Sequence, residues 1–496
     1  MTMTSLAQQL NAAVARHQAG DLEAARGIYQ DILKEHPDQA DALHLLGVLR
    51  DQQGAHAEAV ELISRAIALS PGEASFHGNL GTALLAMQRD ADAEAAYRQA
   101  IRLDPAYAEG HYNLANLLRR RGETAGARRH FETALALQPG YAQARNNLAM
   151  LLWEDLGDNA AAEGQYRLLL QAAPGWATGR MNYGLFRLSQ GQFAEGWREY
   201  EWRWRSETYN ERDWGLGLPR WDGRPLQGES LLVWGEQGPG DQILHGTMLA
   251  DIARLSGGRL FAAVDERLVP LFRRSLSGSG ITVVPRGTTV PAGMQCPFGS
   301  LGNFVRRRRE DFTRRQGGYL RADDGMRQSF LSSYRDLAGG RRLVGLSWWS
   351  ANRSIGEYKS IPWRMLLPLL RRPDVLWICL QYGEAAEEVE AMRREGVAIH
   401  VDRSVDGLAS LDAFAAQVSA LDAVLTVSNT TVHMAGALGV PTALLLARGR
   451  GRLWYWPEQG AETLWYDSVS ALHQPSPGDW SGLVEPAGRF LDRKYG

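Results

Sequence analysis

Proline recurs at a nearly constant interval in the first part of this 496-residue chain. Intervals of 34, 34, 34 and 35 residues separate Pro37, Pro71, Pro105, Pro139 and Pro174. A repeat of this length is typical of a pair of antiparallel helices that buries its apolar face only by stacking on the next pair. The period therefore predicts an α-helical solenoid rather than one globular core for this part of the chain.

Small residues recur at fixed positions inside these repeats. The first helices carry Leu46-Gly47, Leu80-Gly81, Leu114-Ala115, Leu148-Ala149 and Tyr183-Gly184. The second helices alternate small and large residues, as at Ala59, Ile63 and Ala66, which makes one stripe for helix packing. Period, small residues and terminal proline together resemble the tetratricopeptide repeat (TPR) family. We predict a solenoid over residues 1–205 with about six repeats, the last of which lacks its proline.

An asparagine occupies one position of the first helix in four successive repeats: Asn79, Asn113, Asn147 and Asn182. This position is expected to face the concave groove, where an amide offers a donor and an acceptor to a peptide backbone. The series is similar to the asparagine ladder that holds the acceptor polypeptide in O-linked N-acetylglucosamine transferases. The alternatives are that these amides are solvated or bond between repeats. The groove is expected to bind a protein partner.

Composition limits the other partners and the compartment. Lys and Arg (54) nearly balance Asp and Glu (56), and this balance argues against nucleic acid as a partner. Cys296 and Cys379 are the only cysteines, which excludes a disulfide framework and a cysteine-based zinc site. No apolar run reaches the length of a membrane span, and the first residues lack a signal-peptide pattern. We expect a cytoplasmic protein without an integral membrane segment.

Tryptophan is concentrated at the end of the repeats. Seven of the 16 tryptophans lie between Trp176 and Trp234. Residues 206–228 are expected to form an irregular connector. An aromatic cluster at the end of a solenoid is more often a cap against the next domain than a ligand site, and both interpretations remain open.

Short apolar runs that alternate with helical patterns follow the connector. The runs are LLVW, LFAAV, ITVVP, LVGLSWW, VLWICLQY, VAIHV, AVLTVS and TALLLA. This alternation predicts parallel sheets covered by helices. We assign two Rossmann-like lobes, residues 229–338 and 339–496, the second with a closing C-terminal helix. The overall class is α plus α/β.

A glycine-rich segment follows the first strand of the first lobe. Gly235, Gly238 and Gly240 are expected to allow a tight turn, and Asp241 opens the next helix. Ligands bind at the carboxyl ends of parallel strands, so this segment should face a cleft. Asp241 is either the N-cap of the helix or a carboxylate that takes the proton of an acceptor hydroxyl.

A polar turn in the second lobe has the composition of a phosphate site. Ser428, Asn429, Thr430 and Thr431 lie between a buried strand and a helix expected to begin near Thr430. Backbone N–H groups at a helix N-terminus bind phosphate. His433 is a further donor to that group, or else a buried histidine that bonds locally.

Lysine is rare in the chain, and Lys359 lies in a long polar loop after another strand. Ser347, Asn352 and Arg353 share this region. A cation and hydroxyls at a strand end suit a diphosphate leaving group; the alternative is a solvated loop lysine. Gln381 and Tyr382, in the segment LQYG, end the next strand. They are expected to line a base or ribose, unless Tyr382 only packs at the strand end.

Several of these motifs together resemble the GT-B glycosyltransferases that are fused to TPRs in bacteria. They are GEQGPGD, GLSW with KSIPW, LQYG, Asp412–Asp422, SNTTVHMAGALGVP and HQPSPGDW, within about residues 217–492. The catalytic region is similar to heptosyltransferases, and the whole to flagellin-type protein O-glycosyltransferases. The resemblance implies a GT-B fold, Asp241 as base, and Lys359, Thr430, Thr431 and His433 at the donor. The heptosyltransferase Asp-Thr-Gly segment reads Ser428-Asn429-Thr430 here, and His245 is a weak candidate for the catalytic histidine of N-acetylglucosamine transferases.

The function predicted from the sequence is inverting transfer of a sugar from a nucleotide sugar to Ser or Thr of a flagellin-like protein. The one Asp-x-Asp triplet, Asp90-Ala91-Asp92, lies in a repeat turn, so no metal is expected and no cofactor beyond the nucleotide-sugar substrate. The alternatives are a non-catalytic TPR scaffold with a degenerate GT-B domain, and a lipopolysaccharide glycosyltransferase.

Overall fold

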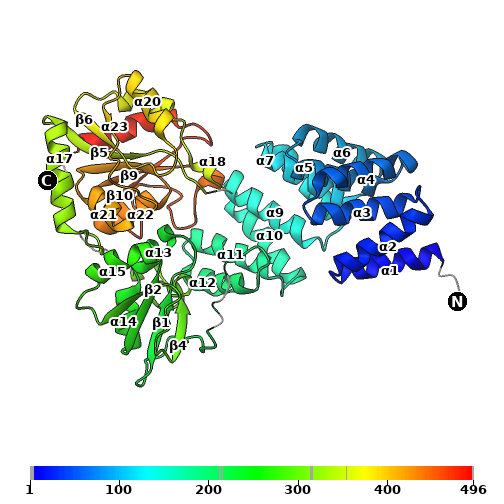
Figure 1. The fold of residues 1–496 in the computed structure, drawn as a ribbon, viewed down its shortest axis with the longest axis horizontal. Helices are drawn as coiled ribbons and strands as arrows, with labels where there is room; N and C mark the ends of the chain where they lie inside the picture. The colour runs from blue at the N-terminus through cyan, green and yellow to red at the C-terminus, as the bar shows by residue number, and fades with distance from the viewer. Residues whose placement is uncertain are drawn as a thin grey trace. The chain divides into compact units, whose positions relative to one another are not determined.

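The computed structural model describes residues 5–209, 211, 214, 216–312, 317–352 and 355–493. The chain divides into two compact units, residues 1–174 and residues 175–496. The first unit is helical, whereas the second holds a helix pair followed by two sheets (Figure 1). The fold is therefore a helical solenoid followed by a region of parallel sheets and helices, as the sequence predicts.

Consecutive helices of the first unit form antiparallel pairs with the predicted period. They are α1 (Leu6–Gln18), α2 (Leu22–Glu35), α3 (Ala40–Gln52), α4 (His56–Leu69), α5 (Ala74–Ala86), α6 (Asp90–Leu103), α7 (Ala108–Arg120), α8 (Thr124–Leu137), α9 (Ala142–Met150) and α10 (Asn159–Ala172).

The recurring small residues let the two helices of a pair approach closely. A Cβ atom at Gly47 of α3 would lie 2.6 Å from Cγ1 of Ile63 in α4. At Gly81 of α5 it would lie 2.6 Å from Cε1 of Tyr97 in α6. Ile63 and Tyr97 are fully buried, so the large residue of each second helix fills the space that the glycine leaves.

The fifth repeat absorbs its extra residue inside a helix. The interval from Pro139 to Pro174 is 35 residues, one more than in the other repeats. A π-helical segment, Leu151–Asp155, continues α9, and Leu156 N–H donates to the Leu151 carbonyl five residues back at 3.1 Å. Such a segment accommodates one inserted residue without breaking the helix.

The second unit begins with α11 (Ala177–Ser189), α12 (Phe193–Tyr200) and a 3₁₀ turn, Glu201–Arg205. Trp197 of α12 is fully buried, and its Nε1–H donates to the Arg306 carbonyl at 2.8 Å. A Cβ at Gly302 would overlap the Trp197 ring, so the chain near Gly302 packs directly on it. The predicted sixth repeat thus shares the hydrophobic core of the sheet that follows.

The first sheet has the order β3-β2-β1-β4, with every pair parallel. Its strands are β1 (Ser230–Trp234), β2 (Arg259–Val264), β3 (Ile281–Pro285) and β4 (Met294–Pro297). The associated helices are α13 (Pro239–Gly246), α14 (Leu249–Ser256), α15 (Val269–Ser275) and α16 (Gly302–Val305).

The second sheet has the order β10-β9-β8-β5-β6-β7, again parallel throughout. Its strands are β5 (Arg342–Ser347), β6 (Val375–Cys379), β7 (Ile399–His400), β8 (Ala423–Val427), β9 (Thr442–Leu446) and β10 (Val469–His473). The helices are α17 (Asp324–Ala338), α18 (Gly356–Lys359), α19 (Leu367–Leu370), α20 (Ala386–Arg394), α21 (Leu411–Ser419), α22 (Thr430–Leu438) and the C-terminal α23 (Val484–Asp492). Tyr334 of α17 accepts a hydrogen bond from Gln417 of α21 at 3.0 Å, which ties α17 to this sheet.

Two strands lie outside the apolar runs of the sequence. β4 and β10 each lie at the end of a sheet, and the outer side of each forms only an isolated bridge, Arg220 with Gln295 and Glu462 with Ser470. Their sequences, MQCP and VSALH, mix polar and apolar residues and so contain no continuous apolar run, although all four residues of β4 are buried.

Candidate functional site

A cavity of about 560 Å³ in the second unit is lined by eight of the twelve residues predicted for the catalytic, donor and glycine-rich parts of the site. It lies where β1, β5, β6 and β8 end, the edge at which parallel sheets bind ligands. Its lining residues are Leu185, Tyr200, Gln237, Gly238, Gly240, Asp241, Ser350, Asn352, Lys359, Tyr382, Ser428, Asn429, Thr430, His433, Leu453, Trp454 and Tyr455. The volume is in the range of small-molecule sites.

The glycine-rich segment differs in detail from the predicted tight turn. Gln237 adopts the left-handed conformation, with φ of 63°, whereas Gly235, Gly238 and Gly240 do not. Gly235 is needed for a close contact, because a Cβ there would lie 2.5 Å from the Gln242 side chain. Gly240 lets α13 approach α22, where its Cβ would lie 3.2 Å from Cδ2 of His433.

Asp241 lies in the first turn of α13 and is not the N-cap. Gly238 is the N-cap, so the N-cap interpretation of Asp241 is wrong. Burial raises the pKa of Asp241 to about 6, and the negative charge of Glu236 acts in the same direction. The attraction of Lys359 and the N–H groups of Gly238 and Asp241 oppose this rise. A carboxyl group with such a pKa exchanges its proton near neutral pH.

Lys359 ends α18 and faces the same cavity. Its side chain is buried, with 4% of the residue exposed, so it is not a solvated loop lysine. Burial lowers the pKa of Lys359 to about 8, against the attraction of Asp241. A buried cation opposite a carboxylate gives the cavity one acidic and one basic group. Arg353, predicted nearby, lies outside the described residues.

The N-terminus of α22 also opens into the cavity, through Thr430. The helix begins at Thr430, as predicted, and Asn429 caps it by accepting from the Thr431 N–H at 3.0 Å. Thr430 is partly exposed, whereas Thr431 is fully buried and does not line the cavity. The N-termini of α13 and α22 thus meet at one wall, where their dipoles favour an anion.

Ser347, Gln381 and Asn429 form a network that holds the strand ends together. Asn429 Nδ2 donates to Ser347 Oγ at 2.8 Å, and Ser347 Oγ donates to Gln381 Oε1 at 3.1 Å. Gln381 Oε1 also accepts from the N–H groups of Trp348 and Trp349 at 3.0 and 3.1 Å. Ser347 and Gln381 therefore brace the wall of the cavity but do not line it, whereas the adjacent Tyr382 does.

His433 lines the cavity as a neutral ring with both nitrogens engaged. Nδ1 lies 3.2 Å from the Tyr466 hydroxyl, and Nε2 lies 3.3 Å from the Tyr455 hydroxyl. The ring stacks on Trp456 at 5.3 Å between centroids. Burial lowers the pKa of His433 to about 3. The local-bonding interpretation accounts for these contacts.

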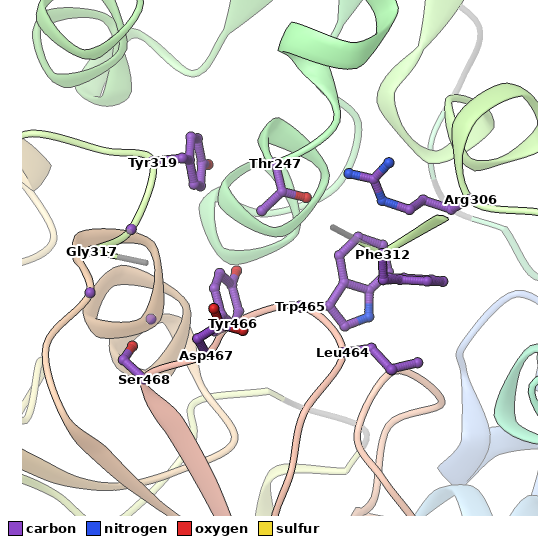
Figure 2. A pocket seen from close by; sticks show the side chains of 13 residues that line it. Thr247, Arg306, Phe312, Gly317, Tyr319, Leu464, Trp465, Tyr466, Asp467 and Ser468 are labelled. Carbon is purple, nitrogen blue, oxygen red and sulfur yellow. The ribbon is translucent and has the colours of Figure 1, made fainter. Parts of the chain in front are cut away.

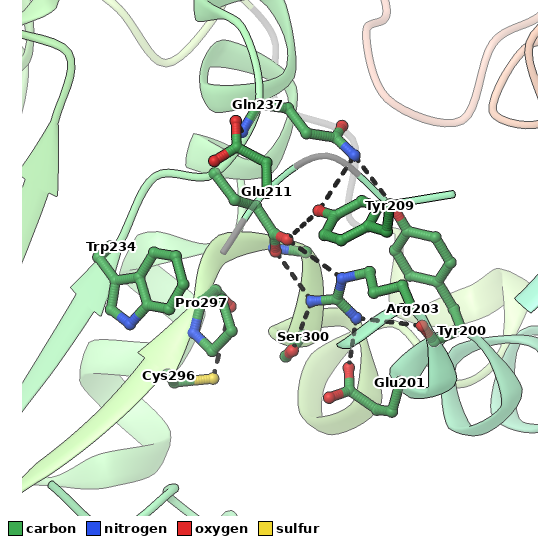
Figure 3. Close-up of polar contacts among 12 residues, drawn as sticks. Tyr200, Glu201, Arg203, Tyr209, Glu211, Trp234, Gln237, Cys296, Pro297 and Ser300 are labelled. Atoms are coloured by element: carbon green, nitrogen blue, oxygen red, sulfur yellow. Dashed lines mark hydrogen bonds and ion pairs between the residues drawn. The ribbon is translucent and has the colours of Figure 1, made fainter. Parts of the chain in front are cut away.

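Sequence reasoning missed a polar cluster around Arg203 (Figure 3), which includes Glu236, whose charge acts on Asp241. Arg203, fully buried in the 3₁₀ turn after α12, donates to both carboxylate oxygens of Glu236 at 3.1 and 2.9 Å. Tyr209 O–H and the Gly299 N–H also donate to Glu236. Gln237 Nε2 donates to the hydroxyls of Tyr200 and Tyr209, at 3.2 Å each. In the sequence, the only sign of this cluster is Glu236, an acidic residue inside the glycine-rich motif GEQGPGD.

His245 lies one turn after Asp241 on α13 and does not line the cavity. Both of its ring nitrogens are buried without a hydrogen-bond partner among the described residues. Burial lowers the pKa of His245 to about 4, so the ring is neutral and packs against Trp197 and Trp465.

A second, small cavity lies next to Trp465 and Phe312 (Figure 2). Figure 2 shows Arg306 and Thr247 on one side and Tyr466 on the other. Its volume is about 40 Å³. That space is large enough for a water molecule and too small for a nucleotide.

The predicted asparagines of the repeats are partly buried on first helices. Asn79 Nδ2 lies 2.8 Å from Nε2 of His44, and Asn147 Nδ2 donates to Asn116 Oδ1 at 2.8 Å. Both contacts join one repeat to the preceding repeat. Asn113 and Asn182 are also partly buried, and Asn182 lies in the second unit.

No helix in the described ranges is both long and apolar enough to cross a bilayer. Within those ranges there is also no group of three or more His, Cys, Asp or Glu side chains placed to hold a metal ion.

Comparisons with known proteins identify the repeats. The sequence profile of the tetratricopeptide repeat matches residues 10–74, 79–128 and 112–177. The N-terminal solenoid is therefore built of TPRs. Protein FlbA of Caulobacter vibrioides is 30% identical over 312 residues, which cover 59% of this chain and 51% of FlbA. The chain spans about half the length of this curated relative, and the aligned part extends beyond residues 1–174.

Two solved structures resemble part of this chain. A thermophilic TPR protein of Thermus thermophilus is 25% identical, with a TM-score of 0.34, over 37% of this chain and 100% of that one. PilW, a widely conserved type IV pilus biogenesis factor, is 20% identical, with a TM-score of 0.36, over 39% of this chain and 89% of that one.

Proposed function

We propose that the chain is an inverting glycosyltransferase of GT-B type that moves a sugar from a nucleotide sugar to Ser or Thr of a protein. The observation that carries the proposal is the cavity in which Asp241, Lys359 and the N-terminus of α22 meet. This set contains a proton acceptor, a cation and exposed backbone donors at the carboxyl ends of two parallel sheets.

The proposed reaction assigns one task to each group. The acceptor hydroxyl gives its proton to the Asp241 carboxylate while its oxygen bonds to the anomeric carbon of the sugar. The bond from that carbon to the diphosphate breaks, and the nucleoside diphosphate leaves with the electron pair. Lys359 and the N–H groups at the start of α22 stabilise its growing negative charge.

The pKa values of Asp241 and Lys359 support their proposed roles as base and as cation. Asp241, with a pKa of about 6, is largely ionised at pH 7, as a base must be. Lys359, with a pKa of about 8, is largely protonated at that pH, as the partner of a diphosphate must be. Because lysine and two helix N-termini supply the positive potential, we propose that transfer needs no metal ion.

The TPRs are the proposed acceptor-binding part. TPRs form grooves that bind other proteins, and the partly buried amides of Asn79, Asn113, Asn147 and Asn182 are the proposed contacts. Flagellin is the proposed acceptor, on the sequence resemblance alone. The cytoplasm is the proposed compartment, since Cys296 and Cys379 are free thiols.

The first experiment is thermal denaturation of the purified chain with UDP-, GDP-, ADP- and CMP-sugars, with and without EDTA. Binding to the native state raises the melting temperature. We expect a rise with one nucleotide class, unchanged by EDTA and smaller in Lys359→Met. Product formation on a protein acceptor then tests transfer, with Asp241→Asn as the inactive variant that still binds the donor.

A non-catalytic TPR scaffold is the second candidate, favoured by the TPRs themselves, the part of the chain that matches a known family. This interpretation predicts binding of a protein partner but no thermal shift with any nucleotide sugar. That result would refute the proposed enzyme.

A further inference from the structure

The cluster of Arg203 and Glu236 joins the sixth helix pair to the loop that carries Asp241. Arg203 follows α12, and Glu236 lies between β1 and α13. Both are buried to at least 99%, and two hydrogen bonds connect them. Arg203 also donates to Ser300 Oγ at 2.9 Å and to Glu201 at 2.9 Å (Figure 3).

The same helix pair fixes the next residue of the loop. Gln237 holds the left-handed conformation, which is unfavourable for a residue with a Cβ. Its side chain donates to the Tyr200 and Tyr209 hydroxyls, and its N–H donates to Glu211 at 3.0 Å. A strained residue persists where its surroundings hold it in several directions. Asp241 follows four residues later, at the start of α13.

The helix pair also forms part of the cavity wall. Leu185 of α11 and Tyr200 of α12 line the cavity together with Gln237 and Asp241. A buried ion pair is no more stabilising than apolar residues of the same volume, so stability alone does not explain why charges occupy this place. The ion pair of Arg203 and Glu236 instead fixes the position of the loop between β1 and α13.

We propose that Arg203 and Glu236 are positioning residues, through which the last TPR sets the place of the Asp241 carboxylate. The inference rests on the function proposed above. It gives Arg203, in the turn after α12, a role in positioning the proposed base, whereas the sequence assigns residues 175–205 only to the recognition solenoid. Glu236 acts through Asp241 and not on the substrate, since Glu236 does not line the cavity.

Glu236→Gln tests this assignment, because it keeps the shape of the side chain and removes its charge. The loop should loosen, and the pKa of Asp241 should fall, because the charge of Glu236 helps to raise it. We expect kcat to fall by roughly tenfold to a hundredfold, the size of effect that a small misplacement causes. The donor KM should stay nearly constant, and the acid limb of the pH profile should move to lower pH.

Tyr209→Phe is the second variant, for the case that Glu236→Gln does not fold. It removes only the hydroxyl that contacts Glu236 and Gln237 and leaves the charge of Glu236 in place, so we expect a smaller loss of kcat without a downward shift of the acid limb. Glu199→Gln is the matched control. Glu199 of α12 is buried and bonds Arg180 of α11 at 2.7 Å, within the same helix pair but away from the loop. It should lower the melting temperature and leave kcat unchanged.

A readout without turnover separates this inference from the proposed function. Carbodiimide labelling of Asp241, followed by mass spectrometry across pH, reports the titration of that carboxyl group directly. A downward shift of this titration in Glu236→Gln, and a changed labelling rate of Asp241 in Tyr209→Phe, both absent in Glu199→Gln, support positioning even if the wild-type chain transfers no sugar. Titration and kcat that match Glu199→Gln in both variants would overturn it.

Discussion

Replacing Asp241 by asparagine should stabilise the protein at the cost of its proposed activity. Burial holds the pKa of Asp241 near 6, against an ordinary value of 3.8. The folded state therefore binds more protons than the unfolded state between these values, and stability falls as pH rises through them. The contribution is fully present below pH 3.8 and is lost by the time the pH has passed 6.

The size of the effect follows from the difference between the two pKa values. About 2.2 pH units, at about 1.4 kcal/mol for each unit, correspond to about 3 kcal/mol above pH 7. Asp241→Asn avoids this cost because the amide carries no charge. We expect the variant to gain about 3 kcal/mol in free energy of unfolding at pH 8 and about half of that at pH 5.

Urea unfolding followed by tryptophan fluorescence measures this gain. All 16 tryptophans except Trp153 lie in residues 175–496, so the signal reports the second unit. Asp251→Asn is the control, since Asp251 on α14 bonds Arg306 at 2.7 Å and its loss should destabilise the fold. An Asp241→Asn variant no more stable than wild type at pH 8, or with a gain that does not grow from pH 5, would refute the reasoning.

Three further outcomes are expected. The proposed transfer should show a bell-shaped pH profile of kcat/KM, with an acid limb near pH 6 from Asp241 and an alkaline limb near pH 8 from Lys359. Lys359→Arg should remove the alkaline limb, because arginine stays protonated. A flat profile counts against both roles. Gly81→Ala should cost roughly 1–3 kcal/mol in unfolding free energy by circular dichroism, because its Cβ meets Tyr97, whereas Gly72→Ala, which meets nothing within 4 Å, should not. Asn113→Ala should weaken binding of the protein acceptor by about 1 kcal/mol in calorimetry, and the exposed Gln143→Ala should not; equal losses would remove Asn113 from the groove contacts.

The solenoid and the sheets could be predicted because their signals are periodic or continuous. A 34-residue period and buried runs such as Val344–Leu346 depend on many residues, so single exceptions do not hide them. The edge strands β4 and β10 lack that redundancy. Asp241, Lys359 and Thr430 could be placed together because the carboxyl ends of parallel strands share one edge.

The rest of the site depends on contacts that leave no local trace. Arg203 and Glu236 are 33 residues apart, on either side of an irregular connector, and neither lies in a repeated pattern. The left-handed turn falls on Gln237 although three glycines surround it, because hydrogen bonds to two tyrosines fix that residue. Ser347 and Gln381 have side chains that could bind a ligand. Only their hydrogen bonds to Asn429 and to the N–H groups of Trp348 and Trp349 show that they hold the strand ends together.

The π-helical segment of the fifth repeat breaks the translational symmetry of the solenoid. A strictly periodic groove offers the same contacts every 34 residues, so an extended chain lying in it can slide by one repeat at little cost. Here Glu154 and Asp155 both bond Arg119 of the fourth repeat at 2.7 Å, an arrangement tied to the one inserted residue. The fifth repeat is thereby distinguishable from its neighbours, so the solenoid no longer maps onto itself when it is shifted by one repeat.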